Sequence, residues 1–456
     1  MMNITVKEIV AVTGGKFLCG DENVVVNDVC IDSRVTKEGD LYVPIIGERT
    51  DGHIYIERAL EKCVATLTSI HDDVVVSDKP YIKVDNTIKA LQDIGAYIRN
   101  KFNIPIVGVT GSVGKTTTRE MIATALSAEL NVYKTSGNQN SQIGTPITLS
   151  RMTSEAEVAV LEMGMSEEGQ MEILSAMVKP DICVVSKIGV AHIEFLKTKE
   201  NIRKEKLSIT SHMNKDGALF LNGDDEMLEE VKDKTGVKTF CYGTKEWCDY
   251  RAENIHMENY QYVYDYVHGD ERVKVVLNAL GKHNVIDSLA GLAIADYMKL
   301  DVRKAAKQFE NFQGLRLKLI HIPGKYTIID DTYNASPDSM KASIDVLDEI
   351  EVPEGGKKLV VLGDMFELGE NSEKYHIEVG EHLAKKKIDD LIVVGELSQH
   401  IADAVEKSDS DIKCYRFKDN GEVALYLLSV MQKDDIVLLK GSNGLHLDEI
   451  VSNMLG

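Results

Sequence analysis

Apolar residues recur along the chain with two different spacings, and each spacing predicts a different element. Residues 87–101 carry Ile88, Leu91, Ile94 and Ile98 at helical spacing, which predicts a helix. Short apolar and β-branched runs between turn residues predict strands. We expect these strands at 24–26, 41–45, 74–76, 106–109, 158–161, 182–185, 326–329, 358–362, 391–394 and 436–439.

Segments with a helical pattern separate many of these strands. We expect helices near 115–129, 167–178, 338–349 and 373–386. Strands that alternate with helices are typical of βαβ units around a parallel sheet. Between residues 236 and 277 the pattern turns more β-like, which predicts an antiparallel flank, and residues 284–312 return to a helical pattern.

The pattern breaks near residues 100 and 315, which predicts three domains in an α/β protein. A length of 456 residues agrees with three domains at ~150 residues each. We expect a small α/β domain at 1–100, a central domain with a parallel sheet and its flank at 101–315, and a Rossmann-like α/β domain at 316–456.

The charge and the cysteines narrow the class of protein. The chain has 52 Lys+Arg and 73 Asp+Glu, a net charge of −21, which argues against a general binder of nucleic acid or anionic membranes. No apolar run approaches the ~18 residues of a membrane span, and the N-terminus lacks the apolar stretch of a signal peptide. The seven scattered cysteines contain no C-x-x-C pair. We therefore expect a cytoplasmic enzyme.

The sharpest motif is G-V-T-G-S-V-G-K-T-T-T at residues 108–118, between a predicted strand and a predicted helix. Glycines let backbone N–H groups close around phosphate oxygens at a helix N-terminus. Lys115 would reach the β- and γ-phosphates, and Thr116 would ligate Mg²⁺. The first glycine of the strict pattern would fall at Val109. The loop leaves kinase, ATPase, GTPase and ATP-driven ligase open.

The spacing G-x-T-G-S-x-G-K-T-T resembles the ATP loop of the Mur ligases, which build the stem peptide of peptidoglycan in the cytoplasm. Further segments match the family in the same order along nearly the whole chain. They are I-D-S-R at 31–34 with G-D-L-Y-V-P at 39–44, E-M-G at 162–164 with I-G-V-A-H at 188–192, E-N-I-R-K-E-K-L-S at 200–208, and D-D-T-Y-N-A-S-P at 330–337 with G-D-M-F-E-L-G at 363–369.

The last pair of strings resembles the branch of the family that adds a dipeptide. The resemblance implies ATP-dependent ligation of D-alanyl-D-alanine to UDP-N-acetylmuramoyl-tripeptide through an acyl phosphate. The family's nucleotide-binding residues correspond here to Gly111, Ser112, Gly114, Lys115, Thr116, Thr117, His283, Asn284, Arg316, Asp331 and Asn334. An asparagine of the family stands as Asp287 in this chain.

The resemblance also implies two magnesium sites. Thr116, Glu162 and His192 would serve as ligands together with Lys206, which the family carries as a carbamylated lysine. Oxygen ligands suit Mg²⁺. Read from the residues alone, Lys206 also fits a solvated basic helix face. Because Ser208 stands where the family often has Glu, Lys204 is the alternative register.

The substrate residues implied by the resemblance lie in two segments. Ser33 and Arg34 would hold the uridine diphosphate end, although taken alone they fit an ordinary surface turn better. Asn138, Asn140 and Ser141 would lie near the sugar and the peptide.

The implied mechanism uses Lys115, Glu162, His192, Lys206 and Arg316 as catalytic residues. Lys115, Arg316 and Mg²⁺ would spread the charge of the attacked γ-phosphate, and domain closure would keep water from the acyl phosphate. His192 is not the expected base, because metal ligation would occupy it.

Two other functions stay open from the sequence. One is a Mur-type or folylpolyglutamate-type ligase that adds a single amino acid, and the other is a nucleotide-binding scaffold without ligase activity. The family precedent makes a monomer the expected state. The third residue of the tripeptide, diaminopimelate or lysine, stays open as well.

Overall fold

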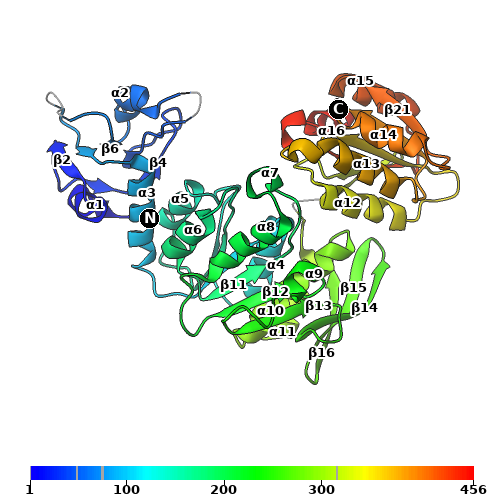
Figure 1. Ribbon diagram of the computed structural model, residues 1–456, viewed down its shortest axis with the longest axis horizontal. Helices are drawn as coiled ribbons and strands as arrows, with labels where there is room; N and C mark the ends of the chain where they lie inside the picture. Colours follow the sequence, from blue (N-terminus) through cyan, green and yellow to red (C-terminus); the bar gives the residue numbers. More distant parts are fainter. Residues whose placement is uncertain (1, 48–49, 73–76, 315–316, 456) are drawn as a thin grey trace. The chain divides into compact units, whose positions relative to one another are not determined.

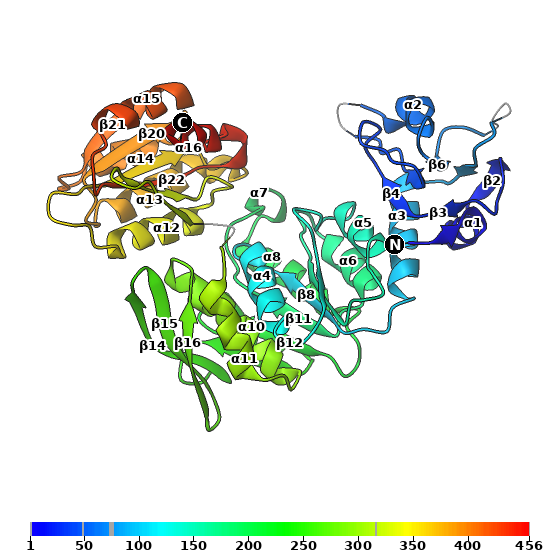
Figure 2. The same cartoon turned by 180° about the vertical axis from the view of Figure 1, so that it is seen from behind.

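The computed structural model describes residues 2–47, 50–72, 77–314 and 317–455, whose strands form four sheets (Figures 1 and 2). The strand predicted at 74–76 and the candidate Arg316 lie outside these described residues. Each of the three larger sheets takes its strands from one continuous stretch of sequence. This mixed α/β architecture confirms the predicted fold class.

The first stretch forms a five-stranded sheet in the order β2-β7-β6-β5-β4, beside a two-stranded sheet of β1 and β3. These strands are β1 (Ile4–Thr5), β2 (Lys16–Cys19), β3 (Val25–Val26), β4 (Asp28–Cys30), β5 (Asp40–Tyr42), β6 (Ala65–Thr68) and β7 (Tyr81–Lys83). The helices are α1 (Val6–Thr13), η1 (Gly52–Tyr55), α2 (Ile56–Leu60) and α3 (Thr87–Arg99). The predicted helix at 87–101 is confirmed as α3, which begins where the side chain of Asn86 accepts from the backbone N–H of Ile88 and of Lys89.

The second stretch forms a nine-stranded sheet in the order β16-β15-β14-β13-β12-β11-β8-β10-β9. Its strands are β8 (Ile106–Thr110), β9 (Val132–Lys134), β10 (Val158–Glu162), β11 (Ile182–Val185), β12 (Ala218–Asn222), β13 (Thr239–Gly243), β14 (Tyr250–Glu258), β15 (Gln261–His268) and β16 (Glu271–Leu277). β10 runs parallel to β8 and β9. The predicted antiparallel flank is confirmed for β14, β15 and β16, whereas β13 pairs with β14 in parallel.

The helices of this stretch are α4 (Lys115–Leu126), α5 (Gly144–Ser150), α6 (Gln170–Val178), α7 (Ile193–Leu196), α8 (Lys199–Leu207), η2 (Ser208–Thr210), α9 (Glu226–Glu229), α10 (Lys282–Tyr297), α11 (Val302–Gln308) and η3 (Phe309–Asn311). Of these, α4, α6 and the α10–α11 segment confirm the predicted helical regions with shifted ends, whereas α5, α7 and α9 were not predicted. α6 begins three residues after the predicted start, because Gly169 takes a left-handed conformation (φ 84°) as its N-cap.

The third stretch forms a six-stranded sheet in the order β17-β18-β22-β19-β20-β21. Its strands are β17 (Lys318–His321), β18 (Thr327–Asp330), β19 (Lys358–Gly363), β20 (Asp390–Val394), β21 (Lys413–Phe417) and β22 (Ile436–Lys440). The helices are α12 (Pro337–Glu349), η4 (Gly369–Asn371), α13 (Ser372–Leu383), α14 (Gln399–Glu406), α15 (Asn420–Val430), η5 (Asn443–Leu445) and α16 (Asp448–Leu455). Only β17 is antiparallel to its neighbour.

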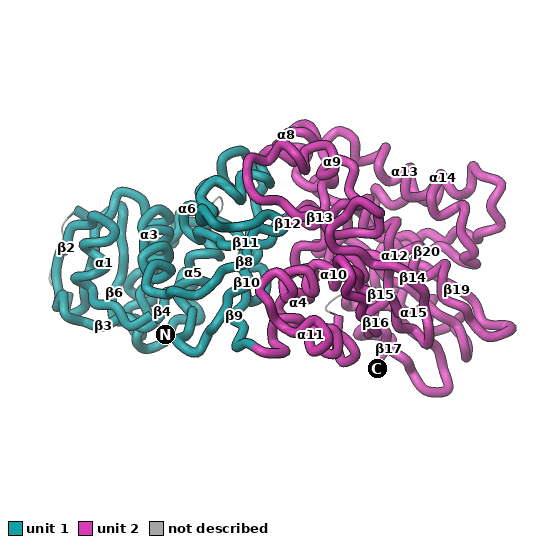
Figure 3. The backbone as a smooth tube through the Cα atoms, turned by 90° about the horizontal axis from the view of Figure 1, so that it is seen from below, with its two compact units in different colours: residues 1–110, 130–184, 205–219 teal, residues 111–129, 185–204, 220–456 magenta. Residues whose placement is uncertain are grey.

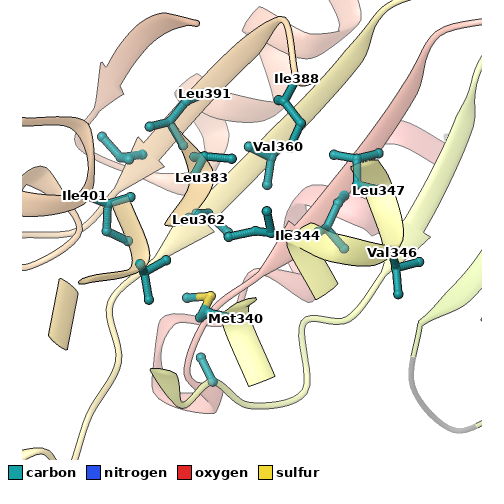
Figure 4. Packing of buried hydrophobic residues seen from close by; sticks show 14 of the residues in the cluster. Met340, Ile344, Val346, Leu347, Val360, Leu362, Leu383, Ile388, Leu391 and Ile401 are labelled. Atoms are coloured by element: carbon teal, nitrogen blue, oxygen red, sulfur yellow. The ribbon is translucent and has the colours of Figure 1, made fainter. Parts of the chain in front are cut away.

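Two apolar clusters cover the two faces of this sheet. Val360 and Leu362 of β19 belong to one cluster, and Leu359 and Val361 of the same strand belong to the other. Figure 4 shows part of the first cluster, in which side chains of α12 and α13 gather on β19 and β20. Burial on both faces explains the continuous apolar runs of these strands. The Rossmann-like arrangement predicted for this stretch is confirmed.

The chain separates into two compact units (Figure 3). Unit 1 contains residues 1–110, 130–184 and 205–219, and unit 2 contains residues 111–129, 185–204 and 220–456. The predicted domain boundaries near 100 and 315 stay predictions. Within the described residues, no helix has the length and apolar character that crossing a membrane requires.

Candidate functional site

The glycine loop lies between the end of β8 and the first residue of α4. Gly114 is the N-cap of α4 and has a φ of 87°, a conformation that favours glycine. Because the N-cap has no side chain, no side-chain hydrogen bond caps this helix. The first backbone N–H groups of a helix lack partners within it. An uncapped N-terminus of a 12-residue helix is therefore suited to bind phosphate oxygens.

The segment at 186–189 supports this loop from within unit 2. The Ser112 N–H donates to the carbonyl oxygen of Lys187 at 2.6 Å, and Oγ of Ser186 donates to the carbonyl oxygen of Val113 at 2.6 Å. A Cβ on Gly111 would lie 2.0 Å from Oγ of Ser186, so this position requires glycine. Nζ of Lys115 donates to the carbonyl oxygen of Gly111 at 2.9 Å. The loop is thus held in a defined shape.

Glu162 lies in unit 1 at the carboxyl end of β10, with 2% of its surface exposed. Nδ2 of Asn140 donates to its Oε1 at 2.7 Å, and the Gly164 N–H donates to the carbonyl oxygen of Asn140 at 2.8 Å. Asn140 therefore orients the Glu162 carboxylate. Asn140 was predicted to bind substrate and Glu162 to bind metal, and in the structure these two side chains are in direct contact.

The donor set around Glu162 fits magnesium. The described residues contain no group of three or more His, Cys, Asp or Glu side chains that could hold a metal ion. Mg²⁺ does not need such a cage, because it is commonly bound by one or two carboxylates, waters and substrate phosphates. A buried, oriented carboxylate such as Glu162 supplies the type of oxygen ligand that this ion prefers.

Lys206 lies on α8 with 1% of its surface exposed, whereas Lys204 on the same helix is exposed. A solvated basic face therefore describes Lys204 but not Lys206. The adjacent Glu205 accepts hydrogen bonds from the N–H groups of Gly169 (3.0 Å) and Met171 (2.8 Å), which fixes Glu205 against the start of α6 within unit 1. The burial favours the register that assigns the family's lysine to Lys206.

His192 precedes the short helix α7 in unit 2 and adopts a left-handed conformation with φ 63°. Its Nδ1 lies 3.5 Å from Oε2 of Glu367. Left-handed non-glycine residues cost free energy and are concentrated at functional sites. The conformation is therefore consistent with a ligand role for His192.

Two candidate residues at the edge of the six-stranded sheet are held by one lysine. Nζ of Lys440 donates to Oδ2 of Asp331 at 2.5 Å and to the carbonyl oxygen of Asn334 at 3.0 Å. Nδ2 of Asn443 donates to the carbonyl oxygen of Tyr333 at 3.1 Å. The side chains of Tyr333 and Asn334 are exposed. The loop therefore presents them to solvent from a fixed backbone.

The remaining candidate residues differ in their exposure and in their hydrogen bonds. Arg34 is exposed and its Nη2 lies 2.7 Å from Oδ2 of Asp32, whose pKa this guanidinium lowers to about 2. Oγ of Ser141 accepts from the Gly144 N–H at 3.2 Å, which supports the start of α5. His283 is exposed, whereas Asn284 is buried with Nδ2 donating to the carbonyl oxygen of Leu280. Ser33 and Thr117 are half-buried, and Asn138 is exposed.

Neither Thr118 nor Lys440 was predicted as a site residue, although Lys440-Gly-Ser442 resembles the substrate-facing C-terminal loop of the family, and Asp287 stood only as a departure from the family pattern. Oγ1 of Thr118 donates to Oδ1 of Asp287 at 2.5 Å. The available signal was a single acidic residue inside a mainly apolar helical segment at 285–295. For Lys440 the signal was a lysine at the end of an apolar strand.

This chain matches two family models and is similar to known proteins over its whole length. Residues 109–295 match the model of the Mur ligase middle domain, and residues 315–443 match that of the Mur ligase glutamate ligase domain. The chain is 35% identical to the UDP-N-acetylmuramoyl-tripeptide–D-alanyl-D-alanine ligase of Bacillus subtilis, over 100% of this chain and 99% of that protein.

Solved structures of MurF proteins are similar to this chain in fold. A crystal structure of MurF from Acinetobacter baumannii superposes with a TM-score of 0.90 at 25% identity and covers 100% of both chains. The MurF ligase of Thermotoga maritima in complex with ADP superposes with a TM-score of 0.83 at 28% identity, over 94% of this chain and 97% of that one. The loop at 108–118, the buried carboxylate at the end of β10 and the match along the whole length place this chain in the Mur ligase family.

Proposed function

We propose that the chain catalyses the ATP-dependent ligation of D-alanyl-D-alanine to UDP-N-acetylmuramoyl-tripeptide, with ADP and phosphate as the other products. The observation that carries this proposal is the uncapped N-terminus of α4 behind a loop held by Ser186 and Lys187. Full-length similarity to dipeptide ligases supports the choice of acceptor. A carboxylate and an amine do not condense unaided in water, so the carboxylate is first activated as an acyl phosphate.

The tripeptide carboxylate attacks the γ-phosphate of ATP, and the amine of D-alanyl-D-alanine then attacks the acyl phosphate and releases phosphate. The N–H groups at the start of α4 and the ammonium of Lys115 stabilise the negative charge that develops on the transferred group. Arg316, which lies outside the described residues, adds a second cation in this proposal.

Thr116, Glu162, His192 and Lys206 are the proposed magnesium ligands. The bound ion neutralises phosphate charge. Carbamylation of Lys206 belongs to the same proposal, because it converts an ammonium in a buried environment into a carboxylate-like oxygen ligand. The 1% exposure of Lys206, in contrast to the exposed Lys204, supports the choice of this residue for the modification.

The remaining assignments follow the same proposal. Ser33, Arg34, Asn138, Asn140 and Ser141 bind the UDP-muramoyl-peptide. His283, Asn284, Asp331 and Asn334 bind the nucleotide. Domains at 1–100, 101–315 and 316–456 close around the substrates and exclude water from the acyl phosphate. The enzyme acts as a monomer in the cytoplasm.

A paired ligation assay tests the proposal. The protein receives Mg-ATP and UDP-N-acetylmuramoyl-tripeptide, with diaminopimelate or lysine as third residue, and either D-alanyl-D-alanine or single amino acids. Phosphate release and product mass are read together. We expect the dipeptide mass increment with D-alanyl-D-alanine only. An increment with a single amino acid would establish a different ligase, and no turnover in any combination would favour a scaffold.

A further inference from the structure

The carboxyl group of Asp287 lies at the contact between α10 and α4. The two helices lie side by side in unit 2 (Figure 2). Asp287 has 7% of its surface exposed and Thr118 has none. Oγ1 of Thr118 donates to Oδ1 of Asp287 at 2.5 Å. This hydrogen bond therefore joins two buried polar groups that are 169 residues apart.

The same carboxyl group lies directly beside the glycine loop. Oδ1 of Asp287 would be 3.3 Å from a Cβ placed on Gly114, and Oγ of Ser186 would be 3.6 Å from it. Gly114 is the N-cap of α4, and Thr118 donates its N–H to the carbonyl oxygen of Gly114 at 2.7 Å. The carboxyl group of Asp287 thus lies close to Gly114, where α4 begins.

The described surroundings of Asp287 contain no cation paired with its carboxyl group. Among the described residues, Thr118 is its hydrogen-bond partner and no ion pair reaches it. Titratable groups on the packed elements have other partners. On α4, Lys115 bonds to Gly111 and Arg119 pairs with Glu120. Tyr242 of β13 bonds to Val185, and on β15 Tyr264 bonds to Ser288 and Tyr266 to Asp296. Lys282 of α10 pairs with Glu349, and Asp225, which precedes α9, accepts from Ile188. Tyr250 is buried on β14, Asp224 accepts from Thr244, and His283 on α10 is exposed.

A buried carboxyl group without a cation is more stable with its proton. Burial raises the pKa of Asp287 to about 7, and the hydrogen bond from Thr118 opposes this rise. Near neutral pH the group therefore changes between a neutral acid and an anion. The anion would place a negative charge beside the loop that we assign to the phosphates, and like charges in a poorly solvated site repel strongly.

We propose that Asp287 is a positioning residue of the phosphate loop that must carry its proton when the nucleotide binds, so nucleotide binding is coupled to proton uptake at this side chain. This inference rests on the proposed role of the loop at 111–116. It goes beyond that role by making the affinity for nucleotide depend on pH through one buried side chain.

Calorimetric titration of the full chain with Mg-ADP tests the inference. Wild type and Asp287→Asn are titrated at pH 6, 7 and 8, each in two buffers of different ionisation enthalpy, so that the proton uptake is measured directly. Asparagine has the size of the protonated acid and does not ionise. If the anion excludes nucleotide, one linked proton weakens the wild-type affinity about tenfold between pH 6 and pH 8, after subtraction of the Asp287→Asn change. The ionisation of ADP is common to both proteins and cancels.

Thr118→Val gives an independent readout. Because the hydroxyl of Thr118 lowers the pKa of Asp287, its loss should move the fall in affinity to higher pH. Kinetics should agree: the KM for ATP of the wild type rises from pH 6 to 8 relative to Asp287→Asn, while the ratio of the two kcat values stays constant.

Three results would overturn the inference. Equal proton uptake and equal pH dependence in wild type and Asp287→Asn would show that Asp287 is not linked to binding. Loss of Mg-ADP binding by a folded Asp287→Asn at every pH would show that the anion is required. Absence of Mg-ADP binding by the wild type would remove the loop assignment and this inference with it. If circular dichroism shows Asp287→Asn unfolded, an unchanged pH profile of Thr118→Val overturns the inference.

Discussion

The ammonium of Lys440 lies 2.5 Å from Oδ2 of Asp331, and the two side chains are 1% and 4% exposed. The pair forms because β18 and β22 are parallel neighbours whose carboxyl ends meet at one edge of the sheet. Oγ of Ser343 also donates to Oδ2 of Asp331 at 2.7 Å. Oδ1 of Asp331 has no partner within the described residues. The carboxylate is thus held firmly through one oxygen, while the other oxygen is buried beside the loop that presents Tyr333 and Asn334.

Replacing Lys440 by Met should destabilise the protein strongly. The substitution leaves the buried Asp331 carboxylate without its cation, which typically costs about 3–5 kcal/mol. The double variant Lys440→Met/Asp331→Asn should recover most of this loss, because it removes both charges. Urea unfolding of the three proteins measures the free energies. The exposed Lys433→Met is the control and should change stability by less than about 0.5 kcal/mol. Equal losses in the single and double variants would contradict the pairing.

Replacing Lys115 by Ala should abolish most of the ATP-dependent turnover. Removal of one group that stabilises transition-state charge typically lowers kcat about 10²- to 10³-fold. Phosphate release with saturating substrates measures the effect, and unchanged thermal unfolding would separate it from loss of fold. Lys304→Ala is the matched control, because Lys304 forms an exposed ion pair with Glu129 on the same unit. A Lys115→Ala variant with full turnover would remove Lys115 from the phosphate site.

Replacing Glu162 by Gln should raise the magnesium requirement. The amide keeps the oxygen that accepts from Asn140 but loses the charge that Mg²⁺ prefers. We expect the Mg²⁺ concentration for half-maximal rate to rise at least about tenfold, by analogy with weakened metal sites. Glu157→Gln, at the exposed residue that precedes β10, is the control and should leave the requirement unchanged. The same Mg²⁺ dependence in both variants would argue against Glu162 as a ligand.

His376 should make the stability depend on pH. It is fully buried on α13, where Nδ1 donates to the carbonyl oxygen of Ser372 and Nε2 accepts from the Met365 N–H at 2.9 Å. Burial lowers the pKa of His376 below its ordinary value of 6.5. Below pH 6.5 the unfolded chain therefore binds more protons at this residue than the folded protein, so the free energy of unfolding falls as the pH decreases.

Urea unfolding at pH 7, 6 and 5 checks this dependence. His376→Gln should show a smaller decrease than wild type, because glutamine does not take up a proton. His256→Gln, at an exposed position on β14, should keep the wild-type decrease. An identical decrease in wild type and His376→Gln would assign the pH dependence to other groups.

Local patterns were sufficient for many elements and for the phosphate loop. Apolar runs of β18, β19, β20 and β22 predicted strands because both faces of this sheet are buried, so nearly every position is apolar. The edge strands β17 and β21 were not predicted. Their partly exposed residues mix polar and apolar types, as in KCYRF at 413–417, and the pattern is too short to identify a strand.

Neighbouring residues along the chain encode the loop at 108–118, the start of α4 and the likeness to the Mur ligases, because these depend on backbone geometry over about ten residues. The contacts between Thr118 and Asp287 and between Lys440 and Asp331 join positions 169 and 109 residues apart. The burial of Lys206 depends likewise on packing in three dimensions. Sequence periodicity carries no information on which distant polar groups meet, because that depends on how helices and strands pack. Tertiary structure alone therefore decided which acid lies beneath the glycine loop.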